Sequence, residues 1–169
     1  MKTVAEFEKI NKKLFKDELK RLGYDSEDPG AAYEALKMPR RATSGSAGYD
    51  FCSPFAFTLE PGESKVVPTG IRAKIEEGWF LMIVPRSGLG FKYRLRLDNT
   101  VGIIDSDYYF SDNEGHIQIK LTNEGLEGKT LCISAGERFA QGIFLPYGVA
   151  AGDTASGVRN GGMGSTDRT

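Results

Sequence analysis

The sequence predicts an all-β domain (a sandwich, a jelly roll or a barrel), preceded by a helical segment and followed by a glycine-rich tail. Two observations predict the β domain. From Met38 onward, short apolar runs rich in Val, Ile and Phe alternate with turn signals, as in "KVVPTGIRAKI", "EEGWFLMIVP" and "HIQIKLTN". Gly and Pro punctuate these runs. The length of 169 residues fits one domain.

The N-terminal segment has the pattern of a helix. Thr3 and Glu6 have the spacing of a capping box, and Gly23 is suited to end a helix. Apolar residues recur between them at helical spacing, with Lys and Glu in between: Val4, Phe7, Ile10, Leu14 and Leu22. The stretch from Gly23 to Pro39 then predicts a loop with a short helical turn.

Composition excludes several classes of function. The net charge of −1 offers no basic field for nucleic acid or an anionic membrane. No apolar run approaches the roughly 18 residues that span a bilayer, and the N-terminus lacks a signal-peptide pattern, so a cytoplasmic location is predicted. Cys52 and Cys132 are expected to be buried and reduced. His116 is the only histidine, which excludes a multi-histidine metal site.

Two polar segments in the first half of the β domain are candidates for chemistry. Asp50 closes "SAGYD" at the head of an apolar strand, where it is either a turn residue or a functional carboxylate. "PRSGLG" follows the apolar run "FLMIV". There Arg86 offers a fork of donors, Ser87 a hydroxyl and Gly88 close backbone approach, which together suit a phosphate; a plain turn explains the same letters.

Two further segments follow. In "NTVGIIDSDYY", Asp105 and Asp107 follow the end of a strand, and alternation would point them the same way. Two close carboxylates suggest a general base or a divalent-cation site, and a solvated turn is the alternative. Tyr108 either stacks on a flat ligand or belongs to the core. In "AGERFAQGIF", Gln141 is either a hydrogen-bonded core amide or a ligand contact.

Taken in order, "SAGYD", "PRSGLG", "VGIIDSDYY", "GERFAQ" and "GGMGST" resemble the five motifs of the trimeric dUTP pyrophosphatases, or dUTPases. The resemblance spans about Met38 to Thr166. It implies a distorted β jelly roll in a homotrimer, with active sites between subunits. It divides the chain into an extension (1–37), a β domain (38–155) and a flexible C-terminal arm (156–169) that closes over a site. The related dCTP deaminases typically have a glutamate where this chain has Asp105, which favours dUTPase.

The resemblance also implies a reaction. The expected reaction is hydrolysis of dUTP to dUMP and pyrophosphate, which limits uracil in DNA and supplies dUMP for dTMP synthesis. Asp105 would activate a water that attacks the α-phosphorus in line. Asn99 would pair with the uracil edge, and Tyr108 would leave no room for a 2′-hydroxyl. Mg²⁺ would be held by triphosphate oxygens and water, with Asp50 in its outer shell. The remaining expected substrate contacts are Arg86, Ser87, Gly88, Gly102, Gln141, Arg159, Gly162, Met163, Gly164, Ser165 and Thr166.

The chain departs from the family pattern in three places. The N-terminal helix is extra, and its apolar stripe must either pack on the trimer or bind a protein partner. The second possibility would suit a nucleotide-gated regulatory protein. "YFSDNEG" (109–115) is an insertion, after which His116 is expected in an exposed loop; Asp107 is interpreted as structural. In the tail, Met163 replaces the usual phenylalanine, and either Arg159 or Arg168 is the arm arginine.

Overall fold

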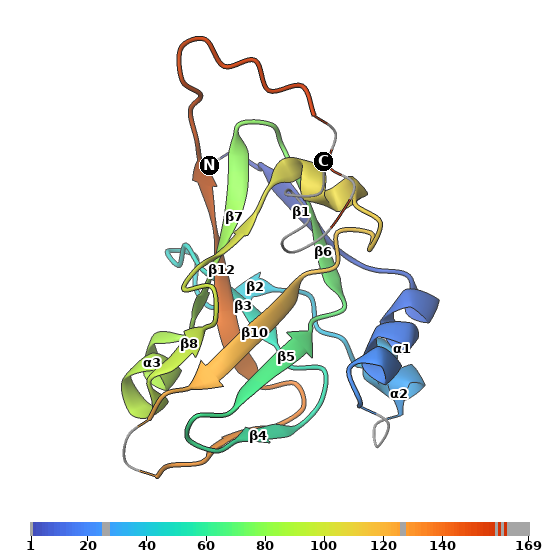
Figure 1. Ribbon diagram of the computed structural model, residues 1–169, viewed down its shortest axis with the longest axis vertical. Helices are drawn as coiled ribbons and strands as arrows, with labels where there is room; N and C mark the ends of the chain where they lie inside the picture. The colour runs from blue at the N-terminus through green and yellow to red at the C-terminus, as the bar shows by residue number, and fades with distance from the viewer. Residues whose placement is uncertain (1, 25–27, 126–127, 158, 160, 162–169) are drawn as a thin grey trace.

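The computed structural model describes residues 2–24, 28–125, 128–157, 159 and 161 of the chain (Figure 1). Most of its elements are strands, which confirms the all-β prediction. The strands are β1 (Ala5–Lys9), β2 (Arg40–Arg41), β3 (Tyr49–Cys52), β4 (Phe57–Leu59), β5 (Ser64–Pro68), β6 (Ile71–Ile75), β7 (Trp79–Pro85), β8 (Leu95–Leu97), β9 (Gly102–Ile104), β10 (Gln118–Asn123), β11 (Leu131–Ile133) and β12 (Arg138–Pro146). The helices are α1 (Lys12–Arg21), α2 (Pro29–Glu34), α3 (Ser87–Tyr93) and the 3₁₀ helix η1 (Ser106–Phe110).

The largest sheet carries the residues that matter for function. Its strand order is β2-β3-β12-β7-β9, and its neighbouring strands pair antiparallel. Three smaller sheets are ordered β5-β10-β8, β1-β6 and β11-β4. Most neighbours are distant in the chain, as expected of a jelly roll rather than a meander. The sheets enclose one apolar core, in which Phe51, Leu81 and Phe139 are fully buried.

The N-terminal prediction is wrong over residues 5–9. These residues form β1, which pairs with β6 along its whole length (Figure 1). The ring of Phe7 lies 5.4 Å from that of Tyr49 and 5.5 Å from that of Phe144, centroid to centroid. Such contacts with distant strands override a local helical pattern. The helix itself is present but begins at Lys12, with Asn11 rather than Thr3 as its cap.

The two helices after β1 pack on the β domain of the same chain. Phe15 and Leu19 of α1 are fully buried, and Leu36 after α2 is nearly so. Gly70 makes this approach possible, because its φ is +72° and an added Cβ would lie 2.5 Å from Leu36 Cδ1. Gly23, with φ +77°, follows α1 as predicted. Of the predicted apolar stripe, Ile10 is buried within this chain, and Val4, Phe7, Leu14 and Leu22 are partly buried.

Both cysteines are free thiols, as predicted, but the prediction that both are buried is wrong. Cys132 is exposed because β11 alternates, with Leu131 and Ile133 facing the core and Cys132 facing out. Cys52 is half-buried. Among the described residues, no helix is long and apolar enough to cross a membrane.

Candidate active site

A pocket of about 500 Å³ lies beside β9 and η1. Four predicted substrate or catalytic residues from the segment 99–108 line it. This segment contains β9, which ends at Ile104, and the start of η1 at Ser106. Arg159 reaches the same pocket from the C-terminal segment. The four residues are Asn99, Gly102, Asp105 and Tyr108.

Tyr108 is both a core residue and a wall of this pocket. Its side chain is buried, its hydroxyl donates to the His116 carbonyl at 2.9 Å, and the Asn113 amide donates to that hydroxyl at 2.8 Å. Burial raises the pKa of Tyr108, so its phenol stays neutral. The ring is thus fixed in place before any ligand arrives.

The insertion after Tyr108 and the N-terminal segment support this pocket together. The Glu114 carboxylate accepts from the Asn11 backbone N–H at 2.8 Å. Glu8 accepts from the Tyr109 hydroxyl at 2.9 Å and pairs with Arg72 at 2.7 Å. The hydrogen bond from Tyr109, and then Arg72, hold the pKa of Glu8 below its ordinary value, against the opposing effect of burial.

His116 is buried, so the expectation of an exposed histidine is wrong. The reason is that α1 lies against it, with the Phe15 and His116 rings 6.5 Å apart. Its Nε2 accepts from the Gly70 N–H at 3.0 Å, and its Nδ1 has no hydrogen-bond partner in the described structure. Burial lowers the pKa of His116 to about 4, so the ring is neutral at neutral pH.

Asp105 and Asp107 lie close together, as predicted, although Asp107 is in η1 and not in a strand. A single guanidinium binds both: Arg159 Nη2 lies 2.5 Å from Asp105 Oδ2, and Arg159 Nε lies 2.9 Å from Asp107 Oδ1. Side-chain exposures are 45% for Asp105 and 54% for Asp107, so both carboxylates remain within reach of solvent. Asp105 is therefore held by the C-terminal segment rather than by the β domain.

A second group of predicted residues lies elsewhere on the large sheet. Asp50 Oδ1 is 3.3 Å from Arg86 Nε, and Asp50 Oδ2 is 3.0 Å from Arg138 Nη1. Gln141 lies opposite Asp50 on β12. An added Cβ at Gly48 would lie 2.5 Å from Gln141 Oε1, so the glycine of "SAGYD" leaves room for that amide. Ser87 and Gly88 are exposed at the start of α3.

The two groups do not converge within one chain. Ile104 lies opposite Leu81 on β7, so Asp105 stands level with position 80, whereas Arg86 follows the far end of the same strand. At about 3.4 Å per residue, positions 80 and 86 are about 20 Å apart. The structure thus brings Asn99, Asp105 and Tyr108 to one pocket beside β9 and η1, whereas Asp50, Arg86 and Gln141 gather around the end of β7 at Pro85.

Some predicted residues lie outside the described part of the chain: Gly162, Met163, Gly164, Ser165, Thr166 and Arg168. Sequence reasoning missed Arg138, although it stands in the quoted "GERFAQ", and it missed Asn113. Arg138 could have been identified from the sequence, because it lies in the motif "GERFAQ" beside other polar residues. Among the described residues, no group of three or more His, Cys, Asp or Glu side chains could hold a metal ion.

Comparison with known proteins identifies the family. A sequence model of the dUTPase family matches residues 34–166. The chain belongs to the dUTPase family. A deoxyuridine 5′-triphosphate nucleotidohydrolase of Lactococcus lactis is 41% identical over 134 residues, covering 78% of this chain and 88% of that dUTPase. One of Escherichia coli is 41% identical over 131 residues, covering 76% of this chain and 82% of that dUTPase.

Solved structures of dUTPases share the fold. The dUTPase of Streptococcus mutans has a TM-score of 0.65 and 35% identity, covering 86% of this chain and 98% of its own. A dUTPase of phage phi11 of S. aureus has a TM-score of 0.64 at 21% identity, covering 92% of this chain and 97% of its own. The predicted membership and the jelly-roll fold are both confirmed. The comparisons do not favour the deaminase alternative.

Proposed function

We propose that this chain hydrolyses dUTP to dUMP and pyrophosphate. The carrying observation is that Asp105, from the family's third motif, stands half-exposed at a pocket walled by Asn99 and Tyr108. An aspartate carboxylate is ionised at neutral pH and can take a proton from a water that attacks the α-phosphorus. The relatives' name, deoxyuridine 5′-triphosphate nucleotidohydrolase, supports the same reaction.

The pocket supports selection of deoxyuridine. The Asn99 amide has both a donor and an acceptor for the edge of uracil. The Tyr108 ring, fixed by the His116 carbonyl and the Asn113 amide, cannot retreat to admit a 2′-hydroxyl. Gly102 lets β9 pack closely on β7 beside the pocket, because an added Cβ there would lie 3.1 Å from Ile83 Cβ. We therefore assign the base and the deoxyribose to this pocket.

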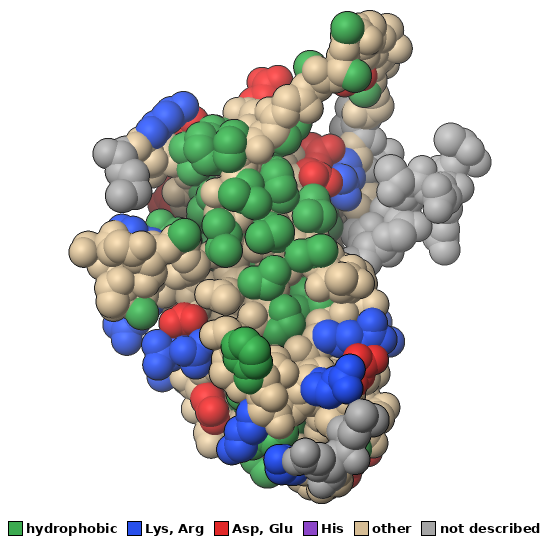
Figure 2. Space-filling view, turned by 90° about the vertical axis from the view of Figure 1, so that its left-hand side faces the viewer, with side chains coloured by type: hydrophobic (Ala, Val, Ile, Leu, Met, Phe, Trp, Pro, Cys, Tyr) green, Lys and Arg blue, Asp and Glu red, His purple; other side chains and the backbone are tan. Residues whose placement is uncertain are grey.

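We infer that the phosphate-binding residues come from a second copy of the chain. Arg86, Ser87 and Gln141 would contact phosphates, but Arg86 lies about 20 Å along β7 from the level of Asp105. The outer face of this sheet is also apolar: Figure 2 shows apolar side chains gathered over the side of the molecule that carries β7 and β12, and Ile103 is 51% exposed. Such faces mark protein interfaces. We propose a homotrimer that buries this face and completes each site.

Magnesium fits as a substrate-bound ion. The described residues offer Asp50 as a single carboxylate whose two oxygens already face guanidinium groups, so direct coordination by a protein cage is not expected. Oxygen donors suit Mg²⁺, which retains waters and uses substrate phosphates. Bound in that way, with Asp50 beyond a water, the ion would neutralise charge on the triphosphate. Asp50 would then orient one of the ion's waters.

The C-terminal arm would close the site. Within one chain, Arg159 binds Asp105 and Asp107. We propose that a triphosphate binds the arm arginine, Arg159 or Arg168, and that Arg159 leaves the two carboxylates when the substrate binds. Gly162 and Gly164 would let the backbone follow the phosphates, Met163 would cover the base, and the hydroxyls of Ser165 and Thr166 would reach the terminal phosphate.

The direct test is pyrophosphate release by the purified full chain with Mg²⁺. Parallel reactions contain dUTP, dCTP, dTTP or UTP. We expect release from dUTP alone, because Asn99 and Tyr108 select the base and the sugar. Ammonia release from dCTP would instead support the deaminase, and no release from dUTP would exclude the proposal.

Shared sites have their own test. Asp105→Asn and Arg86→Ala chains are each expected to be inactive, and they are unfolded and refolded together. If a site takes Asp105 from one chain and Arg86 from another, mixed trimers regain intact sites and activity returns. Refolding each variant alone is the control. A mixture that stays inactive would show that each site uses one chain only.

A further inference from the structure

A second pocket, of about 920 Å³, lies at the β2 edge of the large sheet and is lined by residues of β2, β3 and the start of β12. Its lining includes four cationic side chains, from Lys37, Arg40, Arg41 and Arg138, and one carboxylate, Asp50. This concentration of positive charge contrasts with the chain's net charge of −1. Apart from Asp50, the proposed function gives these side chains no role.

Strand register explains why the charges meet. Arg40 lies opposite Asp50 across β2 and β3, and Arg138 lies opposite Cys52 across β12 and β3. Opposite residues in antiparallel strands share a face of the sheet. Lys37 reaches the same place from the segment before β2, with its ammonium donating to the Gly136 carbonyl at 3.2 Å.

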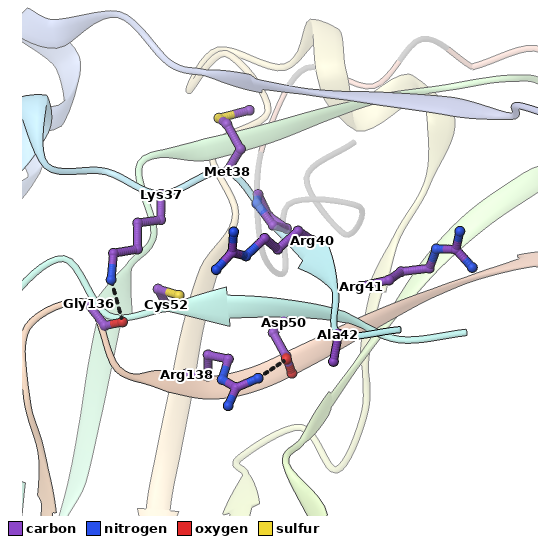
Figure 3. Close-up of a pocket in the computed structure, with 10 residues that line it drawn as sticks. Lys37, Met38, Arg40, Arg41, Ala42, Asp50, Cys52, Gly136 and Arg138 are labelled. Atoms are coloured by element: carbon purple, nitrogen blue, oxygen red, sulfur yellow. Dashed lines mark hydrogen bonds and ion pairs between the residues drawn. The ribbon is translucent and has the colours of Figure 1, made fainter. Parts of the chain in front are cut away.

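The positive charge is not cancelled. Asp50 is the only carboxylate among the lining residues, and it is already shared between Arg138 in the pocket and Arg86 beyond it. Arg40 has no hydrogen-bond or ion-pair partner among the residues that the structure describes. Figure 3 shows the side chains of Lys37 and Arg40 reaching toward Cys52 and Gly136 on one side of β2, while Arg41 points the other way.

Arg41 is accounted for by local structure. Its guanidinium donates to the carbonyls of Ser44 and Ser46 at 2.8 and 3.0 Å and so holds the loop before "AGYD". The other three cations converge on Cys52. The charges of Lys37, Arg138 and Arg40 all favour its thiolate, although burial has the larger effect and raises the pKa of the Cys52 thiol.

We propose that Lys37, Arg40 and Arg138 form a binding site for a phosphate-bearing anion, for which pyrophosphate is the probe. Guanidinium forks pair with phosphate oxygens in two-pronged fashion, and an ammonium adds a point charge. The anion has two possible sources: the terminal phosphates of a nucleotide, reached past Asp50 and Arg86, or free pyrophosphate. The proposal rests on the geometry of this pocket and does not require dUTP hydrolysis.

The first test is calorimetric titration of the full chain with inorganic pyrophosphate, without nucleotide. Arg40→Ala is compared with Lys13→Ala, which removes one positive charge from an exposed position outside the pocket. We expect Arg40→Ala to weaken binding about 10-fold or more, because charged hydrogen bonds to the anion are lost, and Lys13→Ala to bind as the parent. Equal affinity in the parent and Arg40→Ala, or no binding by the parent, would overturn the proposal.

The second test uses Cys52 as a reporter inside the pocket. In a Cys132→Ser background, which removes the exposed thiol, Cys52 is alkylated with and without pyrophosphate. Occupancy should slow the reaction at Cys52, and Arg40→Ala should abolish this protection. An unchanged alkylation rate at a pyrophosphate concentration that saturates the calorimetric signal would place the anion elsewhere and overturn the assignment.

A competition experiment identifies the source. Pyrophosphate is titrated into protein saturated with a non-hydrolysable dUTP analogue. If the analogue blocks pyrophosphate, the pocket holds the nucleotide's own phosphates; if both bind, it holds free pyrophosphate. Either result upholds the site. Because pyrophosphate alone is the primary probe, a chain that fails to hydrolyse dUTP would leave the first two tests intact.

Discussion

Asp50 and Asp105 both accompany short apolar strands, yet the fold treats them in opposite ways. The Asp50 side chain is 11% exposed, and its two oxygens face Arg86 and Arg138, which belong to the β domain. The Asp105 side chain is 45% exposed and binds Arg159 from the C-terminal segment. A carboxylate held by the β domain organises the strands around it. Asp105, whose ion pair among the described residues is with Arg159, can lose that pair without disturbing the strands.

The largest expected effect is a loss of activity, without a loss of the fold, when Asp105 is altered. Asp105→Asn should lower kcat about 1000-fold, because the amide cannot take the proton of the attacking water. Its melting temperature and its affinity for a dUTP analogue should stay close to those of the parent. Steady-state kinetics and a thermal melt check both statements. An Asp105→Asn variant with parental kcat would remove Asp105 from the mechanism.

The support beneath the Asp105 pocket should be sensitive to acid. The pKa of His116 is about 4 when folded and about 6.5 when unfolded, so the unfolded chain binds more protons between these values. Stability is therefore fully present above pH 6.5 and is lost as pH falls toward 4, by about 3 kcal/mol in all. Urea unfolding across this range measures the slope. His116→Gln should flatten it, and a variant with the parental slope would contradict the assignment.

Asp50 should matter for stability where Asp105 does not. Asp50→Asn leaves Arg86 and Arg138 without their shared carboxylate and should cost about 2 kcal/mol. This is less than the loss of a fully buried pair, because both guanidinium groups are partly exposed to water. Asp105→Asn is the matched control and should stay within about 0.5 kcal/mol of the parent. Equal destabilisation of the two variants would contradict the claim that Asp50 contributes more to stability than Asp105 does.

The smallest expected effect is on stability, from the contacts that β1 makes near the Asp105 pocket. Glu8→Gln weakens the contacts with Arg72 and Tyr109 and should cost about 0.5–1 kcal/mol, since the pair is partly exposed. Glu6→Gln, at an exposed position of the same strand, should be neutral. Urea unfolding at neutral pH and low salt compares them. A Glu6→Gln variant as unstable as Glu8→Gln would point to net charge rather than to this cluster.

The sequence predicted the features that depend on local pattern. The alternation of apolar runs and turns was enough for the β domain, and the polar segments at Asp50, Arg86 and Asp105 mark both ends of β7. The closeness of Asp105 and Asp107 was predicted from strand alternation, but Asp107 lies in η1, and both carboxylates instead contact Arg159. The family resemblance, carried by ordered motifs, was confirmed because it did not depend on knowing which strands pair.

The failures arise from contacts between distant segments. Phe7 fits a helical stripe in the sequence, but its three aromatic neighbours come from β3 and β12. His116 follows an insertion and so suggests an exposed loop, but α1 covers it. The cationic pocket was not foreseen either, because Arg40 meets Asp50 only through the register of β2 on β3. None of these pairings leaves a local signal.

The pairing of β1 with β6 has a practical consequence for trimming this protein. Among the described strands, β6 has β1 as its only ladder partner. A shortened chain that starts near Met38, where the family pattern begins, would expose the backbone donors and acceptors of β6 and uncover His116. An unpaired strand edge beside an exposed apolar surface pairs with other chains and promotes aggregation. The expected product is therefore not a minimal enzyme but an aggregate.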